Sequence, residues 1–202
     1  MSNIIVQKFG GTSVGSVERI DAVADIIKNA SLSEKIVVVV SAMSGETNKL
    51  VSLAKHFGDN PDKREFDALV STGETISSAL LTMALHSKGV KARSFSATQI
   101  SMKTTSTYSK AKILDVDSNK IMSVIENDTI PIITGFQGVT ETGDITTLGR
   151  GGSDTTAVAI AAQIKAKRCD IYTDVDGIYT TDPKIVSNAK KLDSITMEEM
   201  LE

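Results

Sequence analysis

KIVVVVSAMSGETNKL, residues 35–50, is the most informative stretch of the sequence for the fold. Residues 36–40 are apolar at every position, as expected for a strand that is buried on both faces of a parallel sheet. Ser41 follows at the carboxyl end of this strand, where open α/β sheets bind their ligands. Thr47 comes near the start of the next predicted helix. Both residues also suit the commoner role of turn or cap residues.

Short apolar runs rich in β-branched residues alternate with helical patterns along the chain. The predicted strands are residues 4–7, 36–40, 92–96, 130–134 and 170–174. The predicted helices are one over residues 17–27 with Ser16 as N-cap, one over 63–87 that Gly73 bends or interrupts, one after Asp117, and one over 154–165. This alternation predicts an α/β protein, with helices on both faces of a mainly parallel sheet.

Composition excludes several classes of protein. The 202 residues are 41% hydrophobic and 23% charged, with a net charge of −3, so we expect a folded domain rather than disorder or a general nucleic-acid or membrane-surface binder. Cys169 is the single cysteine and cannot form an internal disulfide. The amino-terminal residues show no signal-peptide pattern, and no apolar run approaches 18 residues. These features predict a cytoplasmic protein that does not enter a membrane.

The first glycine-rich motif is KFGGTSVGS, residues 8–16. A strand delivers Lys8, and Gly10 and Gly11 allow the backbone to approach a ligand with its N–H groups exposed. Lys8 would then be a cation beside an anion-binding turn. The lysine precedes the glycines, so this is not the P-loop pattern. A simple Gly-Gly turn with a surface lysine is an equally good interpretation of these residues alone.

A second glycine-rich motif, LGRGGSDTTAVAIAA at residues 148–162, enters a helix. Ser153 suits the N-cap and Asp154 the first turn, so unsatisfied N–H groups and the positive end of the helix dipole lie near Arg150. The guanidinium suits a carboxylate or phosphate. We therefore predict an anion site here. Asp154 either stabilises the start of the helix or holds the Lys8 ammonium in position, and the sequence leaves both open.

Other polar residues carry weaker signals. Glu74 stands among small polar residues in a helical segment, where a glutamate is more often solvated than bound to a ligand. Cys169 suits a small buried residue better than a nucleophile. His56 and His86 lack the spacing of metal ligands, and no metal-binding residues are predicted. The acidic stretch DIYTDVDGIYTTDP, residues 170–183, suits either the edge of a nucleotide site or an ordinary turn.

Six motifs in the same order resemble those of aspartokinases, members of the amino acid kinase superfamily. They are KFGGTSV, VSAMSGETN, STGE, GFQG, TTLGRGGSDTTA and YTDVDGIYTTDP, which together span nearly the whole chain. The resemblance implies a three-layer α/β/α sandwich of the carbamate kinase-like type. It also implies transfer of the γ-phosphoryl group of ATP to the side-chain carboxylate of L-aspartate, giving 4-phospho-L-aspartate for lysine, threonine, methionine and diaminopimelate biosynthesis.

The resemblance also implies roles for individual residues. Lys8 and Asp154 would be catalytic, with Asp154 orienting Lys8. Aspartate would contact Ser41, Thr47, Glu74, Arg150, Gly151, Gly152 and Ser153, with Glu74 facing its amino group and Arg150 a carboxylate. The nucleotide would contact Lys8, Gly10, Gly11, Thr173, Asp174, Tyr179 and Lys184. Mg²⁺ would be held mainly through the nucleotide phosphates, and the family predicts a homodimer.

One departure from the family concerns the end of the chain. Residues 194–202, SITMEEMLE, begin like an amphipathic helix, whereas aspartokinase catalytic domains continue further and most carry regulatory ACT domains. We therefore expect residues 1–202 to be one catalytic domain, incomplete at its carboxyl end and without an ACT domain. The alternatives are a kinase for glutamate, acetylglutamate or a nucleoside monophosphate, or a nucleotide-binding module that does not turn over.

Overall fold

The computed structural model describes residues 3–174, 177–181, 185–186 and 188–193. Its centre is a five-stranded sheet with the strand order β3-β6-β2-β1-β9, in which every neighbouring pair is parallel. The strands are β1 (Ile4–Phe9), β2 (Lys35–Val40), β3 (Ala92–Phe95), β6 (Ile130–Thr134) and β9 (Arg168–Tyr172). All five predicted strands are therefore confirmed, with ends that differ by at most two residues.

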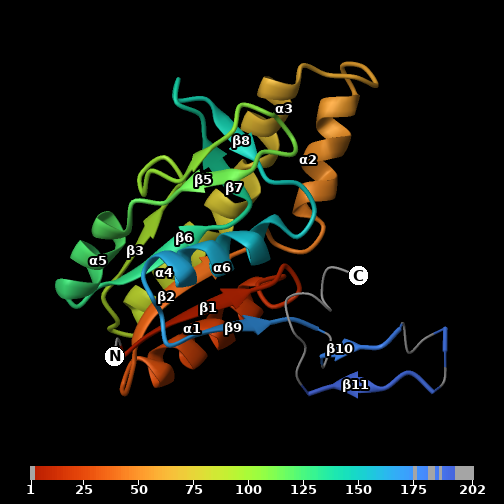
Figure 1. Ribbon diagram of the computed structural model, residues 1–202. Helices are drawn as coiled ribbons and strands as arrows, with labels where there is room; N and C mark the ends of the chain where they lie inside the picture. The colour runs from red at the N-terminus through yellow and green to blue at the C-terminus, as the bar shows by residue number, and fades with distance from the viewer. Residues whose placement is uncertain (1–2, 175–176, 182–184, 187, 194–202) are drawn as a thin grey trace.

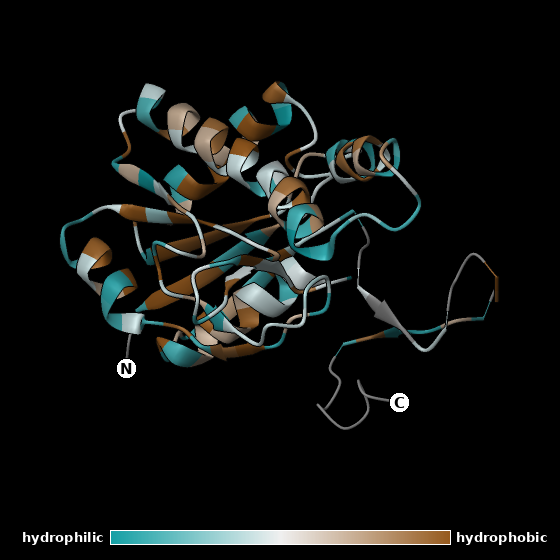
Figure 2. Ribbon diagram, turned by 90° about the horizontal axis from the view of Figure 1, so that it is seen from above, coloured by the Kyte–Doolittle hydropathy of each residue, from teal (hydrophilic) through white to brown (hydrophobic). Residues whose placement is uncertain are grey.

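Helices cover both faces of this sheet (Figure 1). Alternate strand residues point to opposite faces, so Val37 and Val39 belong to one hydrophobic core while Val38 and Val40 belong to the other. α5 (Ser118–Glu126) and α6 (Gly152–Gln163) pack on the first face, and α1 (Val17–Ala30) and α4 (Thr72–Ser87) on the second. Figure 2 shows the hydrophobic strands between the two helical layers. The α/β/α sandwich is confirmed.

The predicted caps and breaks of the helices have mixed outcomes. The Ser16 side chain accepts a hydrogen bond from the N–H of Arg19, which confirms it as the N-cap of α1. The predicted helix over residues 63–87 is in fact two helices, α3 (Lys63–Val70) and α4, which meet at Ser71. Gly73 lies inside α4, where a Cβ atom would come within 2.8 Å of the Cβ of Ala42. This glycine therefore permits close packing and does not break the helix.

By length and composition alone, residues 63–87 form the one segment of the described chain that is long and apolar enough to cross a membrane. Half of its most apolar window is buried inside the protein, as in the core helices of soluble proteins. The segment also carries two buried carboxylates, those of Asp67 and Glu74.

A second sheet of four short strands was not predicted from the sequence. Its order is β5-β4-β7-β8, and it mixes parallel and antiparallel pairs. The strands are β4 (Lys103–Thr104), β5 (Ile113–Asp115), β7 (Gln137–Val139) and β8 (Ile145–Thr147). Together with α2 (Glu46–Lys55) and α3, this sheet lies beyond the carboxyl ends of β2 and β6 (Figure 1). It therefore lies near the edge of the five-stranded sheet where ligands are expected.

After β9, the strands β10 (Ile178–Tyr179) and β11 (Lys191–Leu192) pair as an antiparallel hairpin. Figure 1 shows this hairpin standing apart from the sandwich. The helix expected over residues 194–202 lies outside the described residues.

Candidate active site

A cavity of about 350 Å³ opens at the carboxyl ends of β1 and β2. It receives residues from every glycine-rich motif of the sequence, which lie far apart along the chain. Those predicted to bind a ligand are Lys8, Gly11, Ser41, Thr47, Glu74, Gly151, Gly152, Ser153 and Asp154; the other lining residues are Ala42, Met43, Ser44, Gly45, Phe136 and Gly149. The topology therefore brings nine predicted site residues to one place.

Lys8 lies at the centre of this arrangement. Its position in β1 directs it to the face covered by α6, and there its ammonium nitrogen lies 2.7 Å from Oδ1 of Asp154. The Lys8 side chain is 8% exposed, whereas that of Asp154 is 46% exposed. Because the lysine is nearly enclosed and its partner is half open to the cavity, the pair fixes the ammonium while leaving room for an anion beside it.

Glu74 is buried, contrary to the interpretation of the isolated residue pattern as a solvated glutamate. The residue is 3% exposed, and its Oε1 atom accepts a hydrogen bond of 3.0 Å from the N–H of Ala42. Its Oε2 atom is buried and has no hydrogen-bond partner in the described part of the chain. Burial, opposed by the backbone hydrogen bonds, raises the pKa of the Glu74 carboxyl from 4.5 to about 7.

The unsatisfied oxygen of Glu74 needs a chemical explanation. A buried acceptor without a partner costs free energy, so such a group is a candidate ligand contact when it borders a cavity. A carboxylate accepts hydrogen bonds and binds cations. Glu74 is therefore suited to an ammonium or another cationic donor in this cavity.

The start of α6 differs from its prediction. Gly151 is the N-cap, with a φ of 71° in the left-handed region that favours glycine, and Ser153 lies in the first helical turn. The prediction of Ser153 as N-cap is therefore wrong. The N–H groups of Ser153 and Asp154 have no hydrogen-bond partner in the described residues, so the first turn presents donors and a positive dipole end to the cavity.

Close backbone approaches hold this helix start in place. At Gly135 a Cβ atom would come within 2.6 Å of the Ser153 side chain, and at Gly152 within 2.8 Å of the Phe136 ring. Phe136 itself has a φ of 66°, which is unusual for a bulky residue, and its N–H donates to the Thr156 hydroxyl at 3.2 Å. The GFQG motif signalled this position, but its residues were not among the predicted contacts.

The two glycines after Lys8 differ in what they offer. The N–H of Gly10 donates to the carbonyl of Tyr172 at 3.0 Å, so it is already used inside the protein. Gly11 lines the cavity, and among the described residues no hydrogen bond takes up its N–H. The expectation that both glycines present free N–H groups is thus wrong for Gly10. That hydrogen bond instead ties the carboxyl end of β1 to that of β9.

Of three further predicted substrate contacts, two line the cavity, whereas Arg150 is not among its lining residues. Ser41 and Thr47 line it, from the end of β2 and the first turn of α2. Arg150 lies between two glycines of the lining, is exposed, and makes no hydrogen bond or salt bridge within the described chain. Its guanidinium therefore has all five donors available for an anion.

The predicted nucleotide contacts are less enclosed. Thr173 and Asp174 directly follow β9 and are exposed, and the Thr173 hydroxyl donates to Asp174 at 3.2 Å. Tyr172, which was not predicted, stacks on Phe9 with ring centroids 4.5 Å apart. The backbone of Tyr179 belongs to β10, and Lys184 lies outside the described residues.

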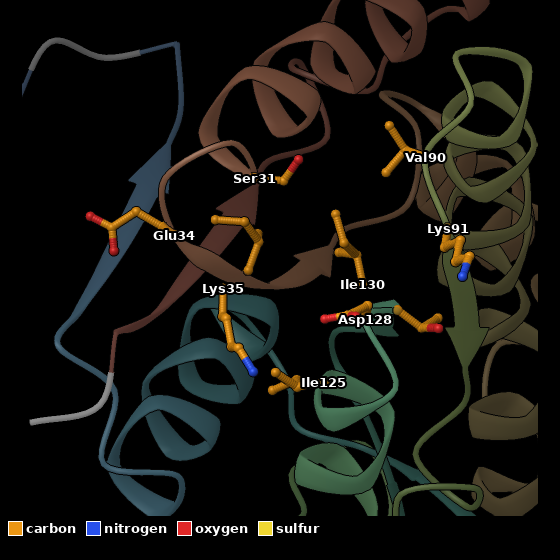
Figure 3. Close-up of a pocket in the computed structure, with 10 residues that line it drawn as sticks. Ser31, Glu34, Lys35, Val90, Lys91, Ile125, Asp128 and Ile130 are labelled. Atoms are coloured by element: carbon orange, nitrogen blue, oxygen red, sulfur yellow. The ribbon is translucent and has the colours of Figure 1, made fainter.

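A second cavity, of about 190 Å³, lies at the opposite ends of the strands (Figure 3). It is lined by Lys35 at the start of β2, Ile130 at the start of β6, and Lys91 just before β3. The Lys35, Lys91 and Asp128 side chains around it are exposed. Open α/β sheets bind ligands at the carboxyl ends of their strands, so the first cavity is the candidate site.

The comparison with protein families agrees with this fold. The model of the amino acid kinase family matches residues 3–202. The chain belongs to the amino acid kinase family. It is 56% identical over 200 residues to an aspartate kinase of Pseudomonas putida and 55% identical to an aspartokinase of Geobacillus stearothermophilus, and each match covers 98% of this chain and 49% of the relative.

Among solved structures, aspartokinase III of E. coli in complex with aspartate and ADP matches with a TM-score of 0.85 at 31% identity. That match covers 94% of this amino acid kinase chain and 53% of the other. An aspartate kinase from Synechocystis matches with a TM-score of 0.82 at 47% identity, over 98% of this chain and 33% of the other. The chain spans about half the length of the curated relatives that it matches.

Proposed function

We propose that the protein is an aspartate kinase, which transfers the γ-phosphoryl group of ATP to the side-chain carboxylate of L-aspartate. The observation that carries the proposal is a cavity lined by the Lys8–Asp154 pair, the start of α6 and Glu74, whose buried Oε2 atom has no hydrogen-bond partner among the described residues. The identity of 56% to an aspartate kinase over nearly the whole chain supports it.

The acceptor half of the site comprises Ser41, Thr47, Glu74, Arg150 and Gly151–Ser153. Glu74 binds the amino group of aspartate, because that ammonium supplies the partner that Oε2 lacks. Arg150 binds a carboxylate, helped by the free N–H groups of the first turn of α6. Ser41 and Thr47 add hydroxyl contacts. The amino group and one carboxylate of the amino acid are thus matched by groups of opposite charge.

The chemistry requires no catalytic base. A carboxylate with a pKa of about 4 is already an ionised nucleophile at neutral pH. One of its oxygens bonds to the γ-phosphorus while the bond to the oxygen shared with the β-phosphate breaks, giving 4-phospho-L-aspartate and ADP. Phosphoryl transfer then needs alignment and positive charge around the moving group. Lys8, held by Asp154, supplies that charge.

The nucleotide half of the site comprises Gly10, Gly11, Thr173, Asp174, Tyr179 and Lys184. Gly11 offers a free N–H to a phosphate, whereas Gly10 contributes by keeping the ends of β1 and β9 together. Mg²⁺ enters with ATP and is held mainly through the phosphates, as is usual in kinase sites. We further propose that the protein works as a homodimer in the cytoplasm, without nucleic-acid or membrane partners.

One assay tests the proposal: ATP-dependent acyl phosphate formation, trapped with hydroxylamine, with L-aspartate, L-glutamate and N-acetylglutamate as acceptors. We expect hydroxamate only with L-aspartate. Turnover only with glutamate or acetylglutamate would show that the specificity is wrong. Nucleotide binding without turnover on any acceptor would instead support a binding module.

A further inference from the structure

Asp67 is a buried charged residue outside the cavity. It lies on α3 and is fully buried, where a carboxylate is costly unless hydrogen bonds satisfy it. Its Oδ2 atom accepts from the N–H groups of Ser109 and Thr147, both at 2.8 Å, and its Oδ1 atom from their hydroxyl groups, both at 3.0 Å. Asp67 therefore connects two segments that lie 38 residues apart in the numbering, one of them from β8.

The two connected segments support the glycine loop that leads into α6. Thr147 is the last residue of β8, only three positions before Arg150. Ser109 has a φ of 66°, an unusual backbone conformation for serine, and Asp67 holds both its N–H and its hydroxyl. The carbonyl of Ser109 lies within 3.3 Å of where a Gly149 Cβ atom would be, so the serine segment packs directly on this loop.

Asp67 is also connected to the helix that carries Glu74. α3 passes into α4 at Ser71, and the carbonyl of Ser71 accepts a 2.6 Å hydrogen bond from the buried side chain of Gln137. This hydrogen bond holds the junction of α3 and α4 in place. A displacement of Asp67 on α3 would therefore also displace the junction. One carboxylate therefore links the element that carries Glu74 to the loop that carries Arg150.

We infer that Asp67 is a positioning residue for the acceptor half: through Thr147 and Ser109 it sets the separation between Glu74 and the loop of Arg150. This inference rests on the proposed function for its link to aspartate. It concerns the binding of the amino acid, because Asp67 accepts hydrogen bonds from Thr147, which precedes the glycine loop, and from Ser109, which packs on that loop, and from no residue at the end of β9 in the described chain.

Two substitutions separate geometry from charge. Asp67→Asn keeps one carbonyl oxygen for the two backbone N–H groups, and its amide can donate to the two hydroxyl groups, which also accept. Asp67→Leu has a similar size but leaves the buried N–H of Thr147 and the partly buried N–H of Ser109 without this acceptor. The stability control is Ile125→Ala, which removes buried apolar atoms from α5 on the first core face.

The first measurement is amide hydrogen exchange, which does not depend on any substrate. We expect Asp67→Leu to raise exchange at Ser109 and Thr147 about tenfold or more relative to the five-stranded sheet, and Asp67→Asn to leave it close to wild type. Thr147→Val, which loses one hydroxyl donor, should raise exchange by an intermediate amount. This variant provides the test if Asp67→Leu does not fold. Unchanged exchange at these amides in both Asp67→Leu and Thr147→Val would overturn the inference.

The second measurement is the affinity for L-aspartate and for ADP by calorimetry. Asp67→Leu should lower the affinity for aspartate about tenfold and change the affinity for ADP by no more than about twofold. Asp67→Asn and Ile125→Ala should bind both ligands as the wild type does. An equal loss of affinity for aspartate and for ADP would show that Asp67 only stabilises the fold in general, and it would overturn the inference. If the wild type does not bind aspartate, the proposed function fails, and the exchange data alone then decide whether Asp67 positions the loop.

Discussion

The proposed acceptor half and the proposed nucleotide half of the site are built differently. In the acceptor half Glu74 is buried, and glycines at 135 and 152 let backbone and side chains approach to distances that no Cβ atom would allow. In the nucleotide half Thr173 and Asp174 are exposed, and the Thr173 hydroxyl donates a hydrogen bond to the Asp174 carboxylate. The difference teaches that the acceptor half is preorganised before ligands bind, so changes there should have larger effects.

The largest effect should come from Lys8, which lies between the two halves. Lys8→Met keeps the aliphatic volume and removes the ammonium, so we expect kcat to fall about 10³-fold or more, because positive charge at the moving phosphoryl group is lost. Aspartate affinity should change little. Steady-state hydroxamate formation and calorimetric titration with L-aspartate measure the two quantities.

Lys49→Met is the matched control for Lys8→Met. Lys49 is exposed on α2 and forms a salt bridge with Glu46 at 3.3 Å. This variant should keep wild-type kcat. Near-normal turnover of Lys8→Met would show that the catalytic role proposed for Lys8 is wrong.

The second largest effect should come from Glu74→Gln. The amide can still accept the hydrogen bond from Ala42, but it carries no charge for the ammonium of the substrate. We expect aspartate affinity to fall about 100-fold, since a hydrogen bond between charged groups in a buried site is lost. The affinity for ADP should stay the same, and a matching loss of ADP affinity would contradict the division of the site into two halves.

The ionisation of Glu74 also predicts a pH dependence. Because its pKa is about 7 in the folded protein and 4.5 ordinarily, the folded state binds the proton more tightly. The free energy of unfolding should therefore decrease as pH rises from about 4.5 to 7, by up to about 3 kcal/mol, and Glu74→Gln should lack this contribution. Aspartate binding should strengthen over the same range. Urea denaturation at pH 5 and pH 8 provides the test, and equal pH dependence in both proteins would refute it.

Some features of the fold and of the site could be predicted from the sequence, and others could not. Residues 36–40 predicted a strand because a strand buried on both faces shows as an uninterrupted apolar run, and shorter runs with β-branched residues predicted the other four parallel strands. The motif order brought Lys8, Glu74 and Ser153 into one predicted site. Their roles stay predictions. Local patterns carry this information because each motif follows directly on its own strand or begins its own helix.

Other features depend on contacts between segments that are distant in the sequence. The strands of the second sheet are two or three residues long, too short to show a period. The burial of Glu74 depends on Ala42, and the burial of Asp67 on Ser109 and Thr147. The sequence held one signal for the burial of Asp67. This residue stands three positions before the buried Val70, so both lie on one face of α3.

A smaller effect is expected at Gly135, which tests how tightly the acceptor half is packed. In Gly135→Ala the new methyl group would lie 2.6 Å from the Ser153 side chain and 2.9 Å from its Cα atom, so the start of α6 must shift. We expect aspartate affinity to fall about tenfold. Gly143→Ala is the control, because it has a φ of 91° and open space around it, and it should lower stability without changing affinity. Equal affinities in the two variants would mean that the acceptor half adapts to its ligand.

The smallest effect is expected at Asp174. Its side chain is exposed beyond β9 and accepts a hydrogen bond from the neighbouring Thr173, so Asp174→Ala removes little from the free protein. We expect ADP affinity to fall no more than about threefold and aspartate affinity to stay the same. Asp115→Ala, at an exposed aspartate of β5, is the control for the loss of one surface charge. A loss of ADP affinity above about tenfold would show that the nucleotide half depends on a single well-placed carboxylate, as the acceptor half depends on Glu74. The contrast between a preorganised half and an open half would then no longer hold.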